Sequence, residues 1–156
     1  MIFEGELADA TSILQECLRV NDQRGEQYVR SYSLHHLALA EWRSGSFAQA
    51  AAHARHALRI KRTFSDLVGI ALAVELLAWI AADEGAPERA TVLLGVAQQI
   101  WQPIGQPLFS SENWTKPHQQ CEAGCRLALG DQAFEATYHR GRNLTTAVAV
   151  AYALSE

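Results

Sequence analysis

The sequence predicts an all-α protein, and three observations support this fold class. Alanine makes up 26 of the 156 residues, and it has the highest helix propensity of all amino acids. The four prolines, which interrupt helices, all lie beyond residue 86. A pattern of glycine and alanine also recurs every 40 residues, and such a period is typical of stacked helical hairpins.

The repeat is marked by glycines 40 residues apart, each followed five residues later by an alanine. The aligned sets are Gly5, Gly45 and Gly85; Ala10, Ala50 and Ala90; Leu14, Ala54 and Leu94; Cys17, Ala57 and Ala97; and Val20, Ile60 and Ile100. Glycine closes a helix easily because it adopts the left-handed conformation without a Cβ clash. The alanines form a narrow stripe at helical spacing, which allows two helix axes to approach closely. Each unit therefore predicts a helix, a turn at glycine and a second, antiparallel helix.

These patterns place the expected helices along the chain. The predicted ranges are 6–21, 26–44, 47–62, 66–84, 87–102, 117–129, 131–140 and 144–154. They group into a partial repeat at 6–25, complete repeats at 26–65 and 66–103, a loop at 104–116 and capping helices at 117–156. A length of 156 residues suits a single domain of this kind. The capping helices are expected to cover the apolar end of the repeat stack.

The first complete unit resembles the tetratricopeptide repeat. The matching residues, in order, are Leu34, Leu37, Ala38, Gly45, Phe47, Ala50, Ala57 and Leu58. The second unit departs from the pattern, because Pro87 stands where Phe47 does. The family's tryptophan and its linking proline are missing from both units, and the period of 40 exceeds the usual 34. The resemblance implies antiparallel helix hairpins wound into a right-handed superhelix.

Longer repeats of this kind resemble the C-terminal arm of bacterial LuxR-type transcriptional regulators and signal-transduction ATPases. The tail strengthens the resemblance, since the segment 141–145, Gly-Arg-Asn-Leu-Thr, looks like the turn before the last helix of such regulators. The resemblance implies a cytoplasmic sensor or protein-interaction arm that binds a peptide, a partner domain or a small effector. It also implies ATPase and DNA-binding domains in a full-length protein. We expect this chain to lack them, since no phosphate-loop motif occurs in it and two residues follow Leu154. A free-standing helical scaffold is the alternative.

The resemblance also implies a binding face. In tetratricopeptide proteins the concave face is lined by first-helix residues at fixed distances before the turn glycine. The corresponding residues are Tyr32, His35, Leu39, Trp42 and Arg43 in one unit, and Leu72, Glu75, Trp79, Ala82 and Asp83 in the next. Packing of Trp42 and Trp79 beneath the tail helices is the alternative interpretation. Glu75 interrupts an apolar helix, and a buried acid needs a partner, for which Arg43 or His35 is the candidate.

No residue pattern predicts catalysis, a cofactor or a metal. A serine-hydrolase elbow is missing from the sequence. His118, Cys121 and Cys125 share one face of a helix and form the best candidate for a metal site. A fourth ligand is not evident, so thiols filling a core are favoured over zinc. The expectation is a protein that is not an enzyme, with a small metal-binding or enzymatic helical protein as the lesser alternative.

The charge and hydropathy pattern limits the partners. A net charge of −4 gives no basic surface for nucleic acid. The most apolar stretch, 68–82, is interrupted by Glu75 and too short to span a membrane. The N-terminus lacks the features of a secretory signal, which predicts a cytoplasmic protein. Leu14, Leu18 and Val20 lie on a helix whose repeat partner is missing, so we expect a homodimer through this end or a continued arm.

Overall fold

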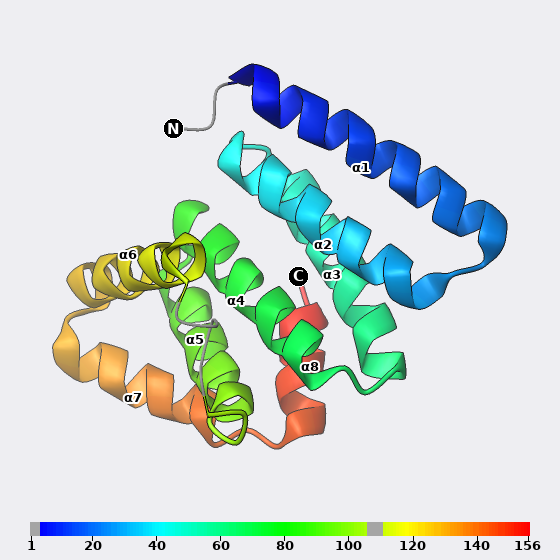
Figure 1. Ribbon diagram of the computed structural model, residues 1–156. Helices are drawn as coiled ribbons and strands as arrows, with labels where there is room; N and C mark the ends of the chain where they lie inside the picture. Colours follow the sequence, from blue (N-terminus) through cyan, green and yellow to red (C-terminus); the bar gives the residue numbers. More distant parts are fainter. Residues whose placement is uncertain (1–3, 106–110) are drawn as a thin grey trace. The chain divides into compact units, whose positions relative to one another are not determined.

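The computed structural model describes residues 4–105 and 111–156, and within these ranges α-helices joined by turns are the only regular secondary structure (Figure 1). The described helices are α1 (Glu4–Arg24), α2 (Gln27–Arg43), α3 (Phe47–Thr63), α4 (Leu67–Asp83), α5 (Pro87–Trp101), α6 (Glu112–Leu129), α7 (Asp131–Arg142) and α8 (Thr146–Leu154). They form two compact units, residues 1–69 and 70–156. The prediction of an all-α protein is therefore confirmed.

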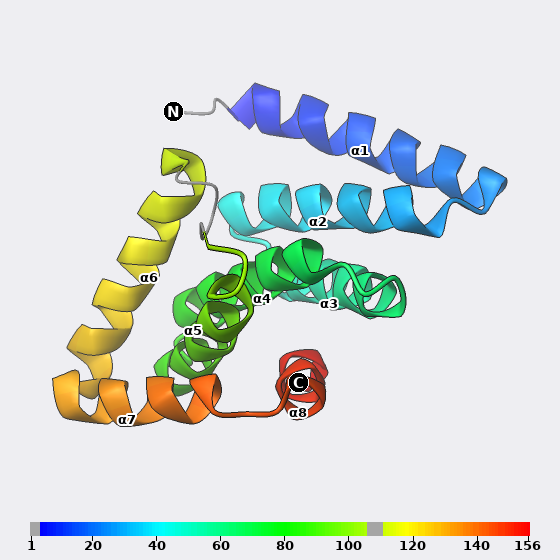
Figure 2. The ribbon, with the colours of Figure 1, turned by 60° about the horizontal axis from the view of Figure 1, so that its bottom comes forward.

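The first unit is built around α2, which packs against both α1 and α3. Figure 2 shows α1 and α2 running side by side. The turns on either side of α2 contain Gly25 and Gly45, whose φ angles are +67° and +83°. Only glycine adopts this conformation without strain, which explains why the repeat carries a glycine at the turn. Leucine and alanine side chains of α2 and α3, including Leu34 and Leu58, form the core of the unit.

The second unit is built around the hairpin of α4 and α5, joined by a turn at Gly85 with a φ of +80°. Helices α6 and α7 both pack against α5. Trp79 and Trp101 are among the largest fully buried side chains, and Phe134 of α7 is buried with them. The later helices thus supply hydrophobic neighbours that the repeat alone would lack.

Two glycines allow α5 and α7 to cross at very short distance. A Cβ atom on Gly95 of α5 would collide with the carbonyl oxygen of Tyr138, and one on Gly141 of α7 with the carbonyl oxygen of Val92. Both obstacles are backbone atoms, which cannot rotate away. The glycine of the 141–145 motif is therefore required by helix packing.

The rest of the 141–145 motif turns the chain into α8. The side-chain amide of Gln99 on α5 donates a 2.8 Å hydrogen bond to the carbonyl of Leu144. The Thr145 hydroxyl accepts a hydrogen bond from the backbone N–H of Val148 and so caps the N-terminus of α8. Arg89 of α5 anchors the C-terminal end of α8. Its guanidinium donates hydrogen bonds to the backbone carbonyls of Tyr152, Ala153 and Ser155.

The helix boundaries agree with the predicted ranges to within three residues, except at the start of α6. This helix begins at Glu112 rather than at residue 117, so Pro117 lies inside it and not in its first turn. Ser111, in extended conformation, is the residue before the helix. The predicted loop at 104–116 is thus shortened at its C-terminal side, and its residues 106–110 lie outside the described part of the chain. Of the helices described, none is both long and apolar enough to cross a membrane.

Candidate interaction surfaces

The predicted face of α2 divides into buried and accessible residues. His35 is only 1% exposed, and Tyr32 is half-buried with its hydroxyl donating a 2.7 Å hydrogen bond to Asp66. Leu39 and Trp42 are half-buried, while Arg43 is exposed. The accessible part of this face therefore lies in the C-terminal half of α2.

Beneath the N-terminal half of α2 lies a charged cluster that the sequence analysis missed. Lys61 of α3 is fully buried and holds its ammonium nitrogen 3.2 Å from the centre of the Tyr32 ring. The same nitrogen lies 3.6 Å from a carboxylate oxygen of Asp66. A Cβ on Gly69 would collide with both side chains. Lys61 lies four residues after Ala57, and this spacing could have shown that it belongs to the buried stripe.

Burial controls the protonation of this cluster. Desolvation lowers the pKa of Lys61 to about 8, although the charge of Asp66 and a hydrogen bond to it act in the opposite direction. Desolvation also lowers the pKa of His35 to about 3, helped by the positive charges of His36 and Lys61. His35 is consequently neutral at physiological pH. Burial and the hydrogen bond to Asp66 raise the pKa of Tyr32, so its phenol stays protonated.

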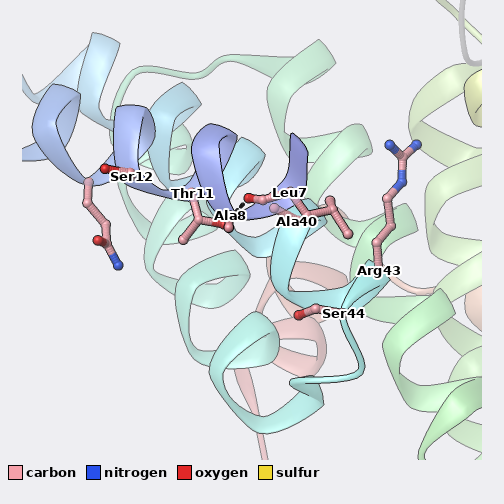
Figure 3. A pocket seen from close by; sticks show the side chains of 8 residues that line it. Leu7, Ala8, Thr11, Ser12, Ala40, Arg43 and Ser44 are labelled. Atoms are coloured by element: carbon pink, nitrogen blue, oxygen red, sulfur yellow. Dashed lines mark hydrogen bonds between the residues drawn. The ribbon is translucent and has the colours of Figure 1, made fainter. Parts of the chain in front are cut away.

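Two hollows flank the contact between α1 and α2. The larger one, about 660 Å³, is shown in Figure 3, and its lining includes Thr11 and Ser12 of α1 and Ala40 and Ser44 of α2. The smaller one, about 360 Å³, is lined mostly by apolar side chains. Its lining residues are Glu6, Leu7, Ala10, Ile13, Leu14, His36, Leu39, Ala40 and Arg43. Leu39 and Arg43 of the predicted face thus line the smaller hollow.

The predicted face of α4 is covered by α6. Trp79 is 1% exposed, and its ring centroid lies 5.9 Å from that of Trp114. Glu75 is also 1% exposed, while Asp83 at the end of the helix is exposed. A ligand could therefore reach Glu75 and Trp79 only if α6 moved. The alternative interpretation, packing of the tryptophan beneath a tail helix, describes the surroundings of Trp79.

The partner of Glu75 is His118, which corrects the expectation of Arg43 or His35. The His118 Nδ1 atom lies 3.1 Å from Oε1 and 3.0 Å from Oε2 of Glu75. His118 also approaches Glu122 on its own helix, with 3.8 Å between Nε2 and Oε2. Burial disfavours the charged imidazolium, but the hydrogen bond and charge of Glu75, with the charge of Glu122, outweigh it and raise the pKa of His118. When His118 is protonated, the arrangement forms an ion pair between α4 and α6, in which Glu75 is buried and His118 half-buried.

The cysteines near His118 have packing roles. Cys121 is buried and donates a weak hydrogen bond through its Sγ to the carbonyl oxygen of Ala78, at 3.7 Å. Cys125 is also buried, at 1% exposure. Among residues 4–105 and 111–156, no group of three or more histidine, cysteine, aspartate or glutamate side chains is arranged to hold a metal ion. His118 and Cys121 contact α4, through Glu75 and the carbonyl of Ala78.

Comparison with known proteins connects the chain to transcriptional regulators over part of its length. A segment of 85 residues, 54% of the chain, is 34% identical to the "Putative HTH-type transcriptional regulator Rv0890c" of Mycobacterium tuberculosis. The same identity and coverage hold for "Putative HTH-type transcriptional regulator Mb0914c" of Mycobacterium bovis. The matched segment spans 9% of each relative. No family model matches the chain, and no solved structure matches it. The chain is thus a helical protein similar, over about half its length, to parts of transcriptional regulators.

Proposed function

We propose that this chain is a tetratricopeptide-like interaction arm of a LuxR-type transcriptional regulator, and that it acts in the cytoplasm by binding rather than by catalysis. The observation that carries the proposal is the 34% identity over 85 residues with regulators of the helix-turn-helix type. The hairpins with left-handed glycines at Gly45 and Gly85, one repeat apart, support it. Relatives more than ten times longer than the matched segment are compatible with ATPase and DNA-binding domains in a full-length protein.

The proposed ligand is a peptide, a partner domain or a small effector, bound on the face of the first helices. In the first unit this face offers Leu39, Trp42 and Arg43, of which Arg43 is exposed. In the second unit Glu75 and Trp79 lie beneath α6. We therefore place the binding surface on the accessible end of α2, at Arg43 and the larger hollow that it lines. No observation favours the alternative of a metal-binding or enzymatic protein.

The first test is the genetic context of the coding sequence. Under the proposal, the same reading frame or the adjoining one encodes a phosphate loop or a helix-turn-helix segment. A frame closed by stop codons on both sides, with no regulator gene beside it, would instead support a free-standing scaffold.

The second test measures transcription in cells that carry Arg43→Glu in the chromosomal copy. Because Arg43 is exposed and lines both hollows, its reversal should change ligand binding without unfolding the chain. We expect a changed set of transcripts in this strain. The control is Leu127→Gln, at a residue of α6 that is 89% exposed and distant in sequence from the proposed face. Unchanged transcripts in the Arg43→Glu strain, together with a lack of regulator motifs, would refute the proposal.

A further inference from the structure

The second helices of the three repeat units carry the same stripe but bury it to different extents. In α3 and α5 the stripe positions Ala50, Ala57, Ala90 and Ala97 are all fully buried. The equivalent positions in α1 are open: Ala10 is half-buried and Cys17 is exposed. At the position between them, Leu93 of α5 is 0% exposed, whereas Ile13 of α1 is 64% exposed. The alanine stripe that is closed in α3 and α5 is thus open at the equivalent positions of α1.

The contacts of α3 show what closes this face. His53 of α3 lies 2.8 Å from the carboxylate of Glu41 on α2. His56 of α3 lies 3.0 Å from the guanidinium of Arg30, near the opposite end of α2. Leu34 and Ala38 of α2 lie between these two contacts and are buried. The first helix of the unit therefore covers the stripe of the second helix along its length.

The open face of α1 forms one wall of the smaller hollow. Leu7, Ala10, Ile13 and Leu14 of α1 line it together with Leu39 and Ala40 of α2. The larger hollow of Figure 3 lies on the other side of Leu7 and is lined by polar residues such as Thr11, Ser12 and Gln15. Only the smaller hollow combines apolar walls with the stripe that α3 and α5 bury. It is the place on α1 that corresponds to the position of α2 on α3.

We propose that the smaller hollow between α1 and α2 is the docking site for one more helix of the α2 type. The occupant is an amphipathic helix of the same repeat in a longer arm, with leucine and alanine at the spacing of Leu34, Leu37 and Ala38. The 40-residue register, which relates the open face of α1 to the closed face of α3, carries this assignment. The proposal concerns assembly and holds independently of a role in transcription.

A second copy of this chain is a poorer occupant. The helix face that it would present is α1 itself, where the exposed side chains around Ile13 and Cys17 include Glu6, Asp9 and Glu16. Pairing two such faces would bring acidic groups together, which disfavours association. The α2 pattern instead offers leucine and alanine to the apolar wall.

The test adds a second copy of α2 with its flanking residues to the N-terminal end of the chain. Because residue 46 aligns with residue 6, the added copy of residues 26–46 replaces residues 1–6 and is joined directly to Leu7. Cys17 reports the result, because it is exposed while Cys121 and Cys125 are buried. We expect a coloured disulfide reagent to label Cys17 at least about tenfold more slowly in the extended chain, since a covered thiol reacts only through local opening.

A matched control separates docking from mere extension. In the control the added copy carries serine in place of the residues equivalent to Leu34, Leu37 and Ala38, so its length is unchanged but its stripe is removed. Here Cys17 should label as fast as in the original chain. Equal labelling of the two extended chains, when circular dichroism shows the added residues to be helical in both, would overturn the proposal. Protection of Cys17 in the original chain that grows with protein concentration would make a second copy the occupant and would also overturn it. Neither outcome depends on transcription, so failure here is distinct from failure of the proposed function.

Discussion

Helices α1 and α5 occupy the same repeat positions, yet one is open on its apolar face and the other is enclosed. Ile13 and Leu93 stand two repeat steps apart, with 64% and 0% of their surfaces exposed. Helix α5 packs against α6 and α7 as well as its hairpin partner, while α1 packs on α2. The repeat pattern thus sets which residues a helix offers, and the neighbouring helices set how much stability those residues contribute.

The largest effect on the free energy of unfolding is expected at Gly141, which allows α7 to pack closely on α5. Gly141→Ala would place a Cβ against the carbonyl oxygen of Val92, and the two helices would have to separate. We expect a loss of about 4 kcal/mol in the free energy of unfolding, measured with urea. Gly124→Ala on α6 is the matched control, because its Cβ would meet no atom within 4 Å. The control should gain about 0.5 kcal/mol or more from helix propensity, and equal effects at both glycines would show that the close crossing is unimportant.

The second prediction compares α1 and α5 directly at equivalent positions. Leu93→Ala leaves a cavity in a fully buried site and should cost about 3 kcal/mol of unfolding free energy. Ile13→Ala removes a side chain that is mostly in water and should cost about 0.5 kcal/mol or less. Urea denaturation of the two variants measures both. A large loss of unfolding free energy for Ile13→Ala would mean that the face of α1 is covered in solution, so that α1 and α5 do not differ in this respect.

The third prediction concerns the ion pair that fixes α6 over α4. Because the pKa of His118 is raised above its ordinary value of 6.5, the folded state binds its proton more tightly than the unfolded state. The pair therefore stabilises fully below about pH 6.5, and this contribution disappears as the pH rises through the folded-state pKa. Replacing His118 by glutamine should cost about 2 kcal/mol at pH 6 and less at pH 9.

The experiment follows tryptophan fluorescence during urea unfolding at these two pH values, since Trp79 and Trp114 lie against each other beside the pair. His139→Gln serves as the control. The side chain of His139 on α7 is 58% exposed, and its Nε2 atom lies 3.7 Å from Oε2 of Glu135. A loss that is the same at both pH values would mean that His118 acts through packing and not through its charge.

The fourth prediction concerns the buried lysine of the first unit. The pKa of Lys61 is lowered from 10.5 to about 8, so between these values the unfolded state binds the proton and the folded state does not. The stability of the first unit should consequently rise with pH from about 8 to about 10. Tyr32 keeps its proton throughout this window because its own pKa is raised. Denaturation of Lys61→Met, followed by circular dichroism from pH 7.5 to pH 10, should lack this rise; a rise of equal slope would assign it to another group.

The sequence predicted the helices well because alanine, glycine and a 40-residue register act locally. Turns at Gly45 and Gly85 follow from the left-handed conformation that glycine adopts there. The predicted start of α6 was wrong. Pro117 suits the first turn of a helix, but in the structure the helix begins earlier and Pro117 lies inside it. The close crossing at Gly95 and Gly141 could not be foreseen, since it depends on two segments far apart in the sequence.

The candidate face shows the same division between local and distant effects. The 40-residue register relates His35 to Glu75, and both are buried rather than open to a ligand. What covers Glu75 is His118, 43 residues away, and no periodicity links the two. Local patterns therefore pointed to Glu75 as a residue of interest, while its burial depends on α6, which lies far from it in the sequence.

The anchoring of α8 by Arg89 bears on the order in which the chain folds. The bonds from Arg89 to Ser155 join residues 66 positions apart, whereas the contact of Lys61 with Tyr32 in the first unit closes a much shorter loop. Folding slows as contacting residues become more distant along the chain. We expect the first unit to form early and the second to finish late, as pulsed hydrogen exchange can show. The enclosed unit, although the more heavily packed of the two, would then be the kinetically slower one.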